Sequence, residues 1–186
     1  MNSEHCVSVH PRRAEDLADA AAALIEVHST DGYPVEGVAD PEAWLSPPQL
    51  LKAWVAELEG RVVGHVAISR PDGEEAVRIW TDRAHVPDSQ VAVLARLFVV
   101  REARGNDVGR WLMAAATASA QMDGLRLVLD VMVKDTAAIR LYERLGWKRI
   151  GMAKHAYGDG QSTEAICFVS PEPGEKLVTE APHGSE

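Results

Sequence analysis

Two absences narrow the class of this protein before any motif is considered. The chain has only two cysteines, Cys6 and Cys167, which is too few for a disulfide scaffold or a cysteine metal framework. It has no apolar run of about 18 residues, the length that a membrane-crossing helix needs. Its first residues, MNSEHCVSVHPRR, do not follow the charged-then-apolar order of a signal peptide. These absences favour a protein that works in a reducing cytoplasm, away from membranes.

Basic residues are also in short supply. The chain carries 19 lysines and arginines against 28 aspartates and glutamates, which gives a formal net charge of −9. A general nucleic-acid binder needs a basic surface, so that class of partner is disfavoured. An acidic surface would attract cationic amines loosely, although simple solubility explains the same charge.

Three widespread motifs are missing from the sequence as well. It contains no G-x-x-x-x-G-K-[ST], no G-x-G-x-x-G after a predicted strand, and no G-x-S-x-G. These absences argue against a nucleoside triphosphate P-loop, a dinucleotide fold and a serine hydrolase.

What is present fits one mixed α/β domain. A chain of 186 residues with 46% hydrophobic residues can bury a full core. We expect the domain over residues 1–170 and an acidic, disordered tail over 171–186. Strands are predicted at 6–10, 52–58, 61–69, 91–100, 125–131, 147–155 and 163–169, with a short extended piece at 77–80. Helices are predicted at 15–28, at 108–122 and between Asp135 and Gly146, and residues 29–48 read as a long irregular segment.

The most informative segment is residues 97–112, LFVVREARGNDVGRWL, where an apolar strand runs into a glycine-bearing turn and then a helix. Consecutive main-chain N–H groups between Arg104 and Gly109 would meet the positive end of the helix dipole, a combination that binds anions. Arg101, Arg104 and Arg110 add positive charge around the turn. The pattern indicates a diphosphate ligand, with a purely structural turn as the alternative.

A second informative segment covers residues 125–147. Its first part, LRLVLDV, is typical of a strand that is buried on both faces. Asp135 is a good N-cap, and Gly146 suits the position just beyond the end of a helix. Leu141 and Tyr142 lie on the apolar face of that helix, so we expect Tyr142 to point inward.

Together these segments resemble the GNAT superfamily of acyl-CoA-dependent N-acyltransferases. In that family a strand, a Q/R-x-x-G-x-G/A turn and a helix bind the pyrophosphate of acetyl-CoA, and Arg104, Val108 and Gly109 fit the pattern. Asp107 stands where the family usually has its first glycine, which would weaken cofactor affinity without abolishing the site. A second family motif, A-x-x-L-Y-x-x-x-G-[FW], matches residues 138–147. The resemblance covers roughly residues 7–169.

The resemblance implies a GNAT-like mixed central sheet of about six or seven strands, flanked by helices and splayed between the strands ending near Val100 and Val131. The pantetheine arm of acetyl-CoA would lie in that gap and pair with main-chain groups, as an added strand does. The cofactor-binding residues implied are Phe98, Val99, Val100, Arg104, Gly105, Asn106, Asp107, Val108, Gly109, Arg110 and Asp135, the last at a position where asparagine is frequent. No metal is expected, and a homodimer is the family-level expectation.

The implied reaction moves an acetyl group from the thioester to a primary amine of a small molecule or peptide by direct attack. Tyr142 is the candidate general acid or stabiliser of the departing thiolate, and a main-chain N–H near Val99 is the candidate donor to the oxyanion. An ordinary tyrosine titrates near 10 and a thiol near 8.5, so full proton transfer is uphill by roughly 2 kcal/mol. A hydrogen bond to the sulfur is therefore favoured over early proton transfer.

The attacking amine must lose a proton, and the base is harder to identify. The strand before the phosphate turn contains no acid, unlike that of some family members. His65 is the first candidate, Glu36, Asp82 and His155 are weaker ones, and an ordered water is a further option.

The long segment 29–48 often lines the acceptor side in the family. Tyr33, Glu36 and Trp44 are therefore candidate substrate contacts, with a structural role as the alternative for each. Aminoglycosides, polyamines, amino acids, protein N-termini and lysine side chains all stay open as acceptors. A different class of function also stays open, a non-catalytic acyl-CoA-binding sensor or regulatory module, to which Asp107 and the missing strand glutamate give weight.

Overall fold

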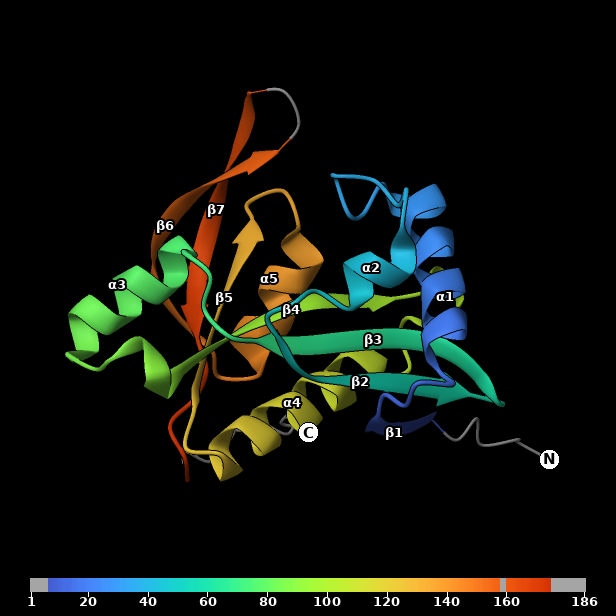
Figure 1. Ribbon diagram of the computed structural model, residues 1–186, viewed down its shortest axis with the longest axis horizontal. Coiled ribbons are helices and arrows are strands. Elements are labelled where there is room, and N and C mark those ends of the chain that lie inside the picture. Colours follow the sequence, from blue (N-terminus) through green and yellow to red (C-terminus); the bar gives the residue numbers. More distant parts are fainter. Residues whose placement is uncertain (1–6, 158–159, 175–186) are drawn as a thin grey trace, which may run out of the picture.

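A single mixed sheet organises the chain. The computed structural model describes residues 7–157 and 160–174, and within them seven strands pair in the order β1-β2-β3-β4-β5-β7-β6 (Figure 1). The strands are β1 (Val7–Pro11), β2 (Leu50–Leu58), β3 (Arg61–Ser69), β4 (Val91–Val99), β5 (Arg126–Met132), β6 (Lys148–Tyr157) and β7 (Gln161–Val169). The helices are α1 (Leu17–Asp31), α2 (Pro41–Leu45), α3 (Glu75–Ala84), α4 (Val108–Met122) and α5 (Thr136–Arg144), with 3-10 turns η1 (Asp88–Gln90) and η2 (Arg101–Ala103). The expected mixed α/β fold of six or seven strands is confirmed.

Alternation along the central strands divides the buried residues into two cores. Val91 and Val93 of β4 pack in a small core that includes Ala76 and Val77 of α3. Ala92 of β4, which points the opposite way, belongs to the main core, which α1 and α4 also line. A strand buried on both faces must be apolar at nearly every position, which explains the continuous apolar run of β4.

The sheet opens between β4 and β5. These strands are parallel, and their ladder contains only the pairs Val91–Arg126, Ala92–Leu127 and Val93–Val128. Beyond Val93 the two strands separate, and in Figure 1 β5, β6 and β7 run at a steep angle to β2 and β3. The predicted splay is therefore confirmed, and the second half of β4 has a side without a ladder partner among the described residues.

Two helices differ from the sequence expectations. Residues 77–80 are not extended but belong to α3, because Ala76, Val77 and the partly buried Trp80 recur at helical spacing on one face. Helix α2 lies in the segment predicted to be irregular. It begins with Asp40, which accepts a hydrogen bond from the Ala43 N–H at 3.0 Å, followed by Pro41 in the first turn. The tail expected at 171–186 falls largely outside the described residues.

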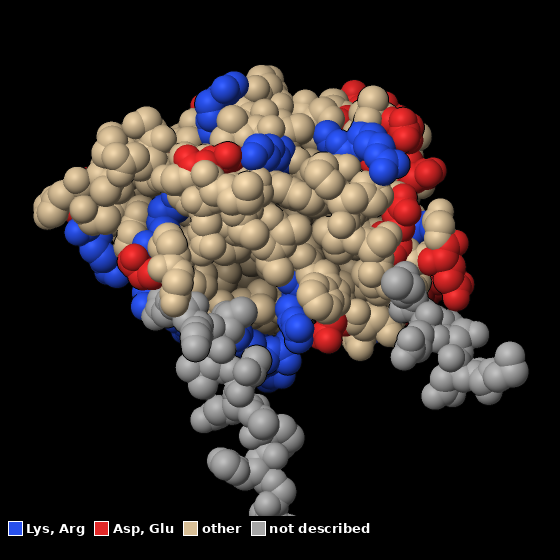
Figure 2. Space-filling view, turned by 90° about the horizontal axis from the view of Figure 1, so that it is seen from below, with Lys and Arg blue, Asp and Glu red and all other residues tan. Residues whose placement is uncertain are grey.

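Charge on the surface agrees with the composition. Figure 2 shows one face of the molecule, on which acidic side chains gather along one side and basic ones form separate small groups. This face has no continuous basic stripe of the kind that nucleic acid requires, among the residues drawn in colour. None of the helices in the described ranges combines the length and the apolar character that crossing a bilayer demands.

The contact between β3 and α4 leads to a prediction about stability. A Cβ on Gly64 would lie 3.0 Å from Leu112 Cδ1, 3.1 Å from the Phe98 carbonyl oxygen and 3.1 Å from Val108 Cγ1. Because the carbonyl is part of the sheet and cannot move freely, we expect Gly64→Ala to lower the free energy of unfolding by about 1–3 kcal/mol. Urea denaturation followed by circular dichroism measures this change.

Gly151 provides the matched control for that substitution. Its added Cβ would meet only the side chain of Ile79, at 3.0 Å from the terminal Cδ1, and that methyl group can rotate away. Gly151→Ala should therefore cost less than Gly64→Ala. Equal losses in the two variants would contradict the close approach of Gly64 to the Phe98 carbonyl and to the side chains of α4.

Candidate functional site

The turn between β4 and α4 presents a run of main-chain donors. Gly105 has a φ of 81° and Asp107 a φ of 57°, and this left-handed backbone turns the chain into α4. The first N–H of the helix that finds a main-chain acceptor is that of Trp111, which donates to the Asp107 carbonyl at 3.0 Å. Within the described part of the chain, the N–H groups of residues 105–110 donate to no main-chain carbonyl. A run of this kind at the positive end of a helix dipole is suited to an anion.

Two of the predicted arginines are already engaged. Arg101 donates to the Thr30 carbonyl and to Asp31 Oδ1, each at 2.8 Å, and Arg104 also forms an ion pair with Asp31. These contacts, the Arg104 hydrogen bond first, lower the pKa of the Asp31 carboxyl. Asp31 therefore offsets part of the positive charge expected around the turn. The main-chain N–H groups of the turn do not pair with Asp31, so they stay available to an anion.

Asp107 stands at the position where the family motif has a glycine, and its backbone conformation explains that preference. Its φ of 57° lies in the left-handed region, which glycine adopts without strain. The Asp107 side chain caps no N–H of α4, and its nearest cation is Arg110 at 3.9 Å, with both side chains exposed. The carboxylate of Asp107 is therefore held only by a loose ion pair at the mouth of the turn.

The exposed side of β4 needs a correction at Val100. The Val100 N–H donates to the Val63 carbonyl at 2.9 Å and its carbonyl accepts from the Ala103 N–H at 3.0 Å, so neither group is free for a pantetheine amide. Phe98 lies opposite His65 in the β3 ladder, so its main-chain N–H and carbonyl also point to β3. By alternation, Val99 points its N–H and carbonyl to the opening beside β5. Its carbonyl accepts from Arg104 Nε at 3.1 Å and Nη2 at 3.0 Å.

The surroundings of His65 do not suit a general base. The ring is fully buried and stacks on Phe98 at a centroid distance of 5.5 Å. Arg12 Nη1 donates to Nε2 at 3.0 Å, so Nδ1 carries the proton and donates to the Arg96 carbonyl at 3.0 Å. Burial lowers the pKa of His65 to about 3. Both ring nitrogens already make hydrogen bonds, so His65 cannot act as a base. The bond from Nδ1 holds the main chain at Arg96.

Tyr142 is a buried phenol without a hydrogen-bond partner among the described residues. The side chain is 6% exposed and packs against Trp147 and Phe168 at centroid distances of 6.0 and 5.7 Å. Burial, followed by the negative charges of Asp135 and Asp130, raises the pKa of Tyr142 above that of a free phenol. The group therefore stays protonated and can donate a hydrogen bond.

The three residues proposed for the acceptor side lie in one cluster. The Tyr33 and Trp44 rings meet edge to face at 5.8 Å, and the Arg96 guanidinium lies 5.0 Å from the centre of the Trp44 ring. Burial raises the pKa of Tyr33, with further contributions from Tyr142 and Glu36, so these groups are close enough to interact electrostatically. The structure thus brings Tyr33, Glu36 and Trp44 together with Tyr142.

Arg96 is the member of this cluster that the sequence analysis missed. Its signal was nevertheless present, because it is the one charged residue in the strand sequence VAVLARLFVV. Asp135 lies nearby at the start of α5, where its side chain caps no N–H and burial raises its pKa. Asp82, a weaker candidate base, pairs with Arg78 on the exposed surface of α3. The side chain of His155 falls outside what the structure describes.

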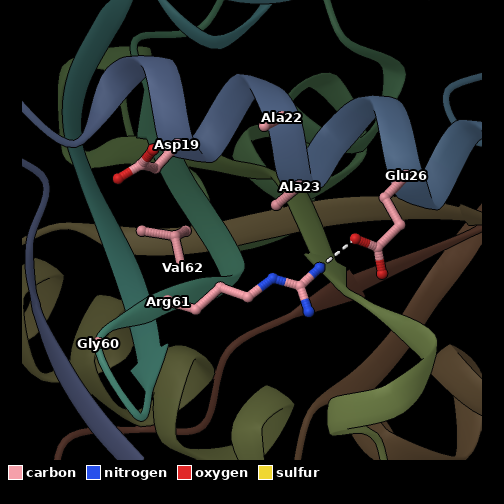
Figure 3. Close-up of a pocket in the computed structure, with 7 residues that line it drawn as sticks. All are labelled: Asp19, Ala22, Ala23, Glu26, Gly60, Arg61 and Val62. Carbon is pink, nitrogen blue, oxygen red and sulfur yellow. Dashed lines mark hydrogen bonds and ion pairs between the residues drawn. The ribbon is translucent and has the colours of Figure 1, made fainter.

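Two surface hollows lie apart from these groups. One, of about 250 Å³, lies between α1 and the start of β3 and is crossed by the Arg61–Glu26 ion pair (Figure 3). The other, of about 300 Å³, is lined by residues of β2, β3 and η2. Neither is lined by Tyr142, Arg96 or the turn at 105–110, so neither marks the candidate site.

A splayed sheet lies beside a turn whose N–H groups donate to no main-chain carbonyl among the described residues, an arrangement suited to a protein that binds an extended, phosphate-bearing ligand such as coenzyme A. The model of the acetyltransferase (GNAT) family matches residues 18–147, and the chain belongs to this family. No curated protein sequence matches the chain.

Solved structures support the same fold at low sequence identity. An N-acetyltransferase from Staphylococcus aureus Mu50 has a TM-score of 0.67 and 17% identity, with 88% of this chain and 97% of that chain covered. A ribosomal-protein-alanine N-acetyltransferase from Brucella melitensis has a TM-score of 0.67 and 22% identity, over 88% and 98% of the two chains. NAA60 of Arabidopsis thaliana, solved with acetyl-CoA, has a TM-score of 0.67 and 18% identity, over 88% and 97%.

Proposed function

We propose that this acetyltransferase uses acetyl-CoA as its co-substrate and acetylates a primary amine of a small molecule or peptide by direct attack. The observation that carries the proposal is the run of N–H groups at 105–110, which donate to no main-chain carbonyl of the described residues. This run follows β4, which separates from β5 beyond Val93. The turn would hold the pyrophosphate, and the open side of β4 would align the pantetheine arm toward Tyr142.

We assign one group to each step of this reaction. The neutral amine attacks the thioester carbonyl, and the Val99 N–H stabilises the oxyanion that forms. When the carbon–sulfur bond breaks, Tyr142 donates a hydrogen bond to the thiolate. The amine proton leaves through Glu36 or through water, since the buried His65 cannot accept it.

Asp107 provides a test of the phosphate turn by a gain of affinity. A carboxylate close to a diphosphate is repulsive by about 1 kcal/mol in water, so Asp107→Asn should tighten acetyl-CoA binding roughly fivefold. Asp107→Gly removes the same charge and also the strain at φ 57°, so its affinity should be at least as high. Isothermal titration calorimetry at low salt measures both values of Kd.

Glu102→Gln is the control for this charge effect. Glu102 is exposed on η2, pairs with Arg61 and lies before the turn, so its substitution should change Kd by less than about twofold. If Asp107→Asn binds acetyl-CoA no more tightly than the unaltered protein, the diphosphate does not lie at this turn.

The function itself is tested by two measurements on the full chain. Calorimetry should show uptake of acetyl-CoA, and mixing acetyl-CoA with a panel of primary amines should release thiol above background. A sensor or regulatory module, the competing function, would bind acetyl-CoA and release no thiol with any amine. No uptake of acetyl-CoA or coenzyme A at millimolar concentration would exclude both functions.

A further inference from the structure

Arg96 lies at an irregular point of β4. The β3–β4 register shifts between His65–Phe98 and Ala67–Ala95, so β4 contains one residue more than β3 across this interval. Arg96 has a φ of 57°, in the left-handed region that a residue with a side chain rarely adopts. A bulge of this kind redirects a side chain, and such strained positions concentrate at functional sites.

The surrounding contacts fix the orientation of the guanidinium. Arg96 Nε donates to the Trp44 carbonyl at 2.6 Å, and the guanidinium lies over the Trp44 ring. The His65 Nδ1–H holds the Arg96 carbonyl at 3.0 Å from the other side of the residue. The guanidinium is planar in any arginine, and these contacts fix the direction in which its two terminal nitrogens point. A planar fork of fixed direction can bind a carboxylate through two hydrogen bonds.

Arg96 differs in its partners from the arginines that are paired or capped. Arg12 is also partly buried without an ion pair, but its terminal nitrogens donate to the Leu45 carbonyl, His65 and Ser46. Among the described residues, Arg96 donates only through Nε. Arg61, Arg101, Arg104 and Arg126 each form an ion pair with a carboxylate. Arg96 has no carboxylate within 4.0 Å among the described residues, although it is more buried than most, and burial lowers its pKa. Glu36, Glu74 and the Tyr33 phenol act on it from longer range. A half-buried guanidinium without a direct anion is unfavourable unless a ligand supplies one.

Arg96 also belongs to the cluster that contains the acceptor-side residues. It contacts Trp44, Trp44 contacts Tyr33, and Tyr142 lies near enough to Tyr33 to help raise its pKa. Building on the proposed function, we infer that Arg96 binds a carboxylate of the acceptor, so that the substrates are amines that also carry a carboxylate. The carboxylate would lie against Arg96, and its amine would lie toward Glu36 and the thioester.

The test compares free L-amino acids with the matching L-amino acid amides. The two members of each pair differ only in the carboxylate, and the less basic amine of the amide works against the expected preference. We expect kcat/KM for the best acid to exceed that for its amide by at least about tenfold. In Arg96→Gln the value for the acid should fall about one hundredfold, and the value for the amide should change less than about threefold. Arg96→Lys, which keeps the charge but not the planar fork, should be intermediate.

The same pairs of acid and amide distinguish a misfolded variant from one that has lost recognition of the carboxylate. A variant that folds poorly would lose activity toward acids and amides equally, and thermal melting together with acetyl-CoA titration would reveal it. Calorimetry of the coenzyme A-loaded protein with one acid and its amide reads recognition even without turnover.

The outcomes distinguish this inference from the proposed function. If acids and amides are acetylated or bound equally well, Arg96 does not read a carboxylate, and the proposed acetyltransferase function stands. If acetyl-CoA binds and no amine releases thiol, the proposed function fails. In that case a loss of acid binding in Arg96→Gln would still support the carboxylate site, and unchanged binding would overturn it.

Discussion

Replacing Tyr142 with phenylalanine should lower kcat about ten- to one hundredfold and leave Kd for acetyl-CoA within about twofold. The phenol is buried, protonated and without a hydrogen-bond partner among the described residues, so its donor is available when negative charge develops on the sulfur. The thioester ground state carries little charge there, which is why binding should change little. Steady-state thiol release gives kcat, and calorimetry gives Kd.

Tyr33→Phe is the matched control, because Tyr33 is another phenol of the same cluster whose pKa is raised by burial. Loss of the Tyr33 hydroxyl should lower kcat less than loss of the Tyr142 hydroxyl. The raised pKa of Tyr142 also means that the phenol does not ionise between pH 6 and about pH 10, so the unaltered enzyme should show no loss of kcat from this group in that range. Unchanged kcat in Tyr142→Phe would remove the residue from the mechanism.

Local sequence signals predicted the elements beside the turn well. Helix α4 spans Val108–Met122 and β3 spans Arg61–Ser69, both as expected, because a glycine-bearing turn, a hairpin turn and an apolar period mark these ends within a few residues. Helix α3 was missed because Val77, Ile79 and Trp80 are residues that favour strands, and only the packing of α3 on β4 and β6 decides between the two periods.

The candidate site was predictable where its chemistry is local and not where it depends on distant contacts. The donor run at 105–110 follows from the turn sequence alone. The ion pairs of Asp31 join residues 70 and 73 positions apart, and no sequence pattern indicates them. The same holds for His65. Its ring is fully buried and its nitrogens are engaged by Arg12 and the Arg96 carbonyl, so a residue expected to act as a base holds the bulge at Arg96.

Arg110→Pro should weaken acetyl-CoA binding at least about tenfold more than Arg110→Ala. Arg110 is the exposed third residue of α4, and its N–H has no helical acceptor, so proline there breaks no main-chain hydrogen bond of the helix. The proline removes that N–H together with the side chain, whereas the alanine removes only the side chain. Loss of one hydrogen bond to a charged group is worth about 1.5–3 kcal/mol, or roughly 10- to 150-fold in Kd.

The Arg110→Ala variant measures how much the positive charge of the side chain contributes to acetyl-CoA binding. Arg110→Ala should change Kd by about threefold or less and should reduce its dependence on salt, because it removes an exposed cation. The further loss in Arg110→Pro should persist at high salt, since a directed main-chain donor is screened less than an exposed charge. Similar melting temperatures would establish that α4 still forms. If the proline and alanine variants then bind acetyl-CoA equally, the main-chain N–H groups of this turn do not hold the pyrophosphate.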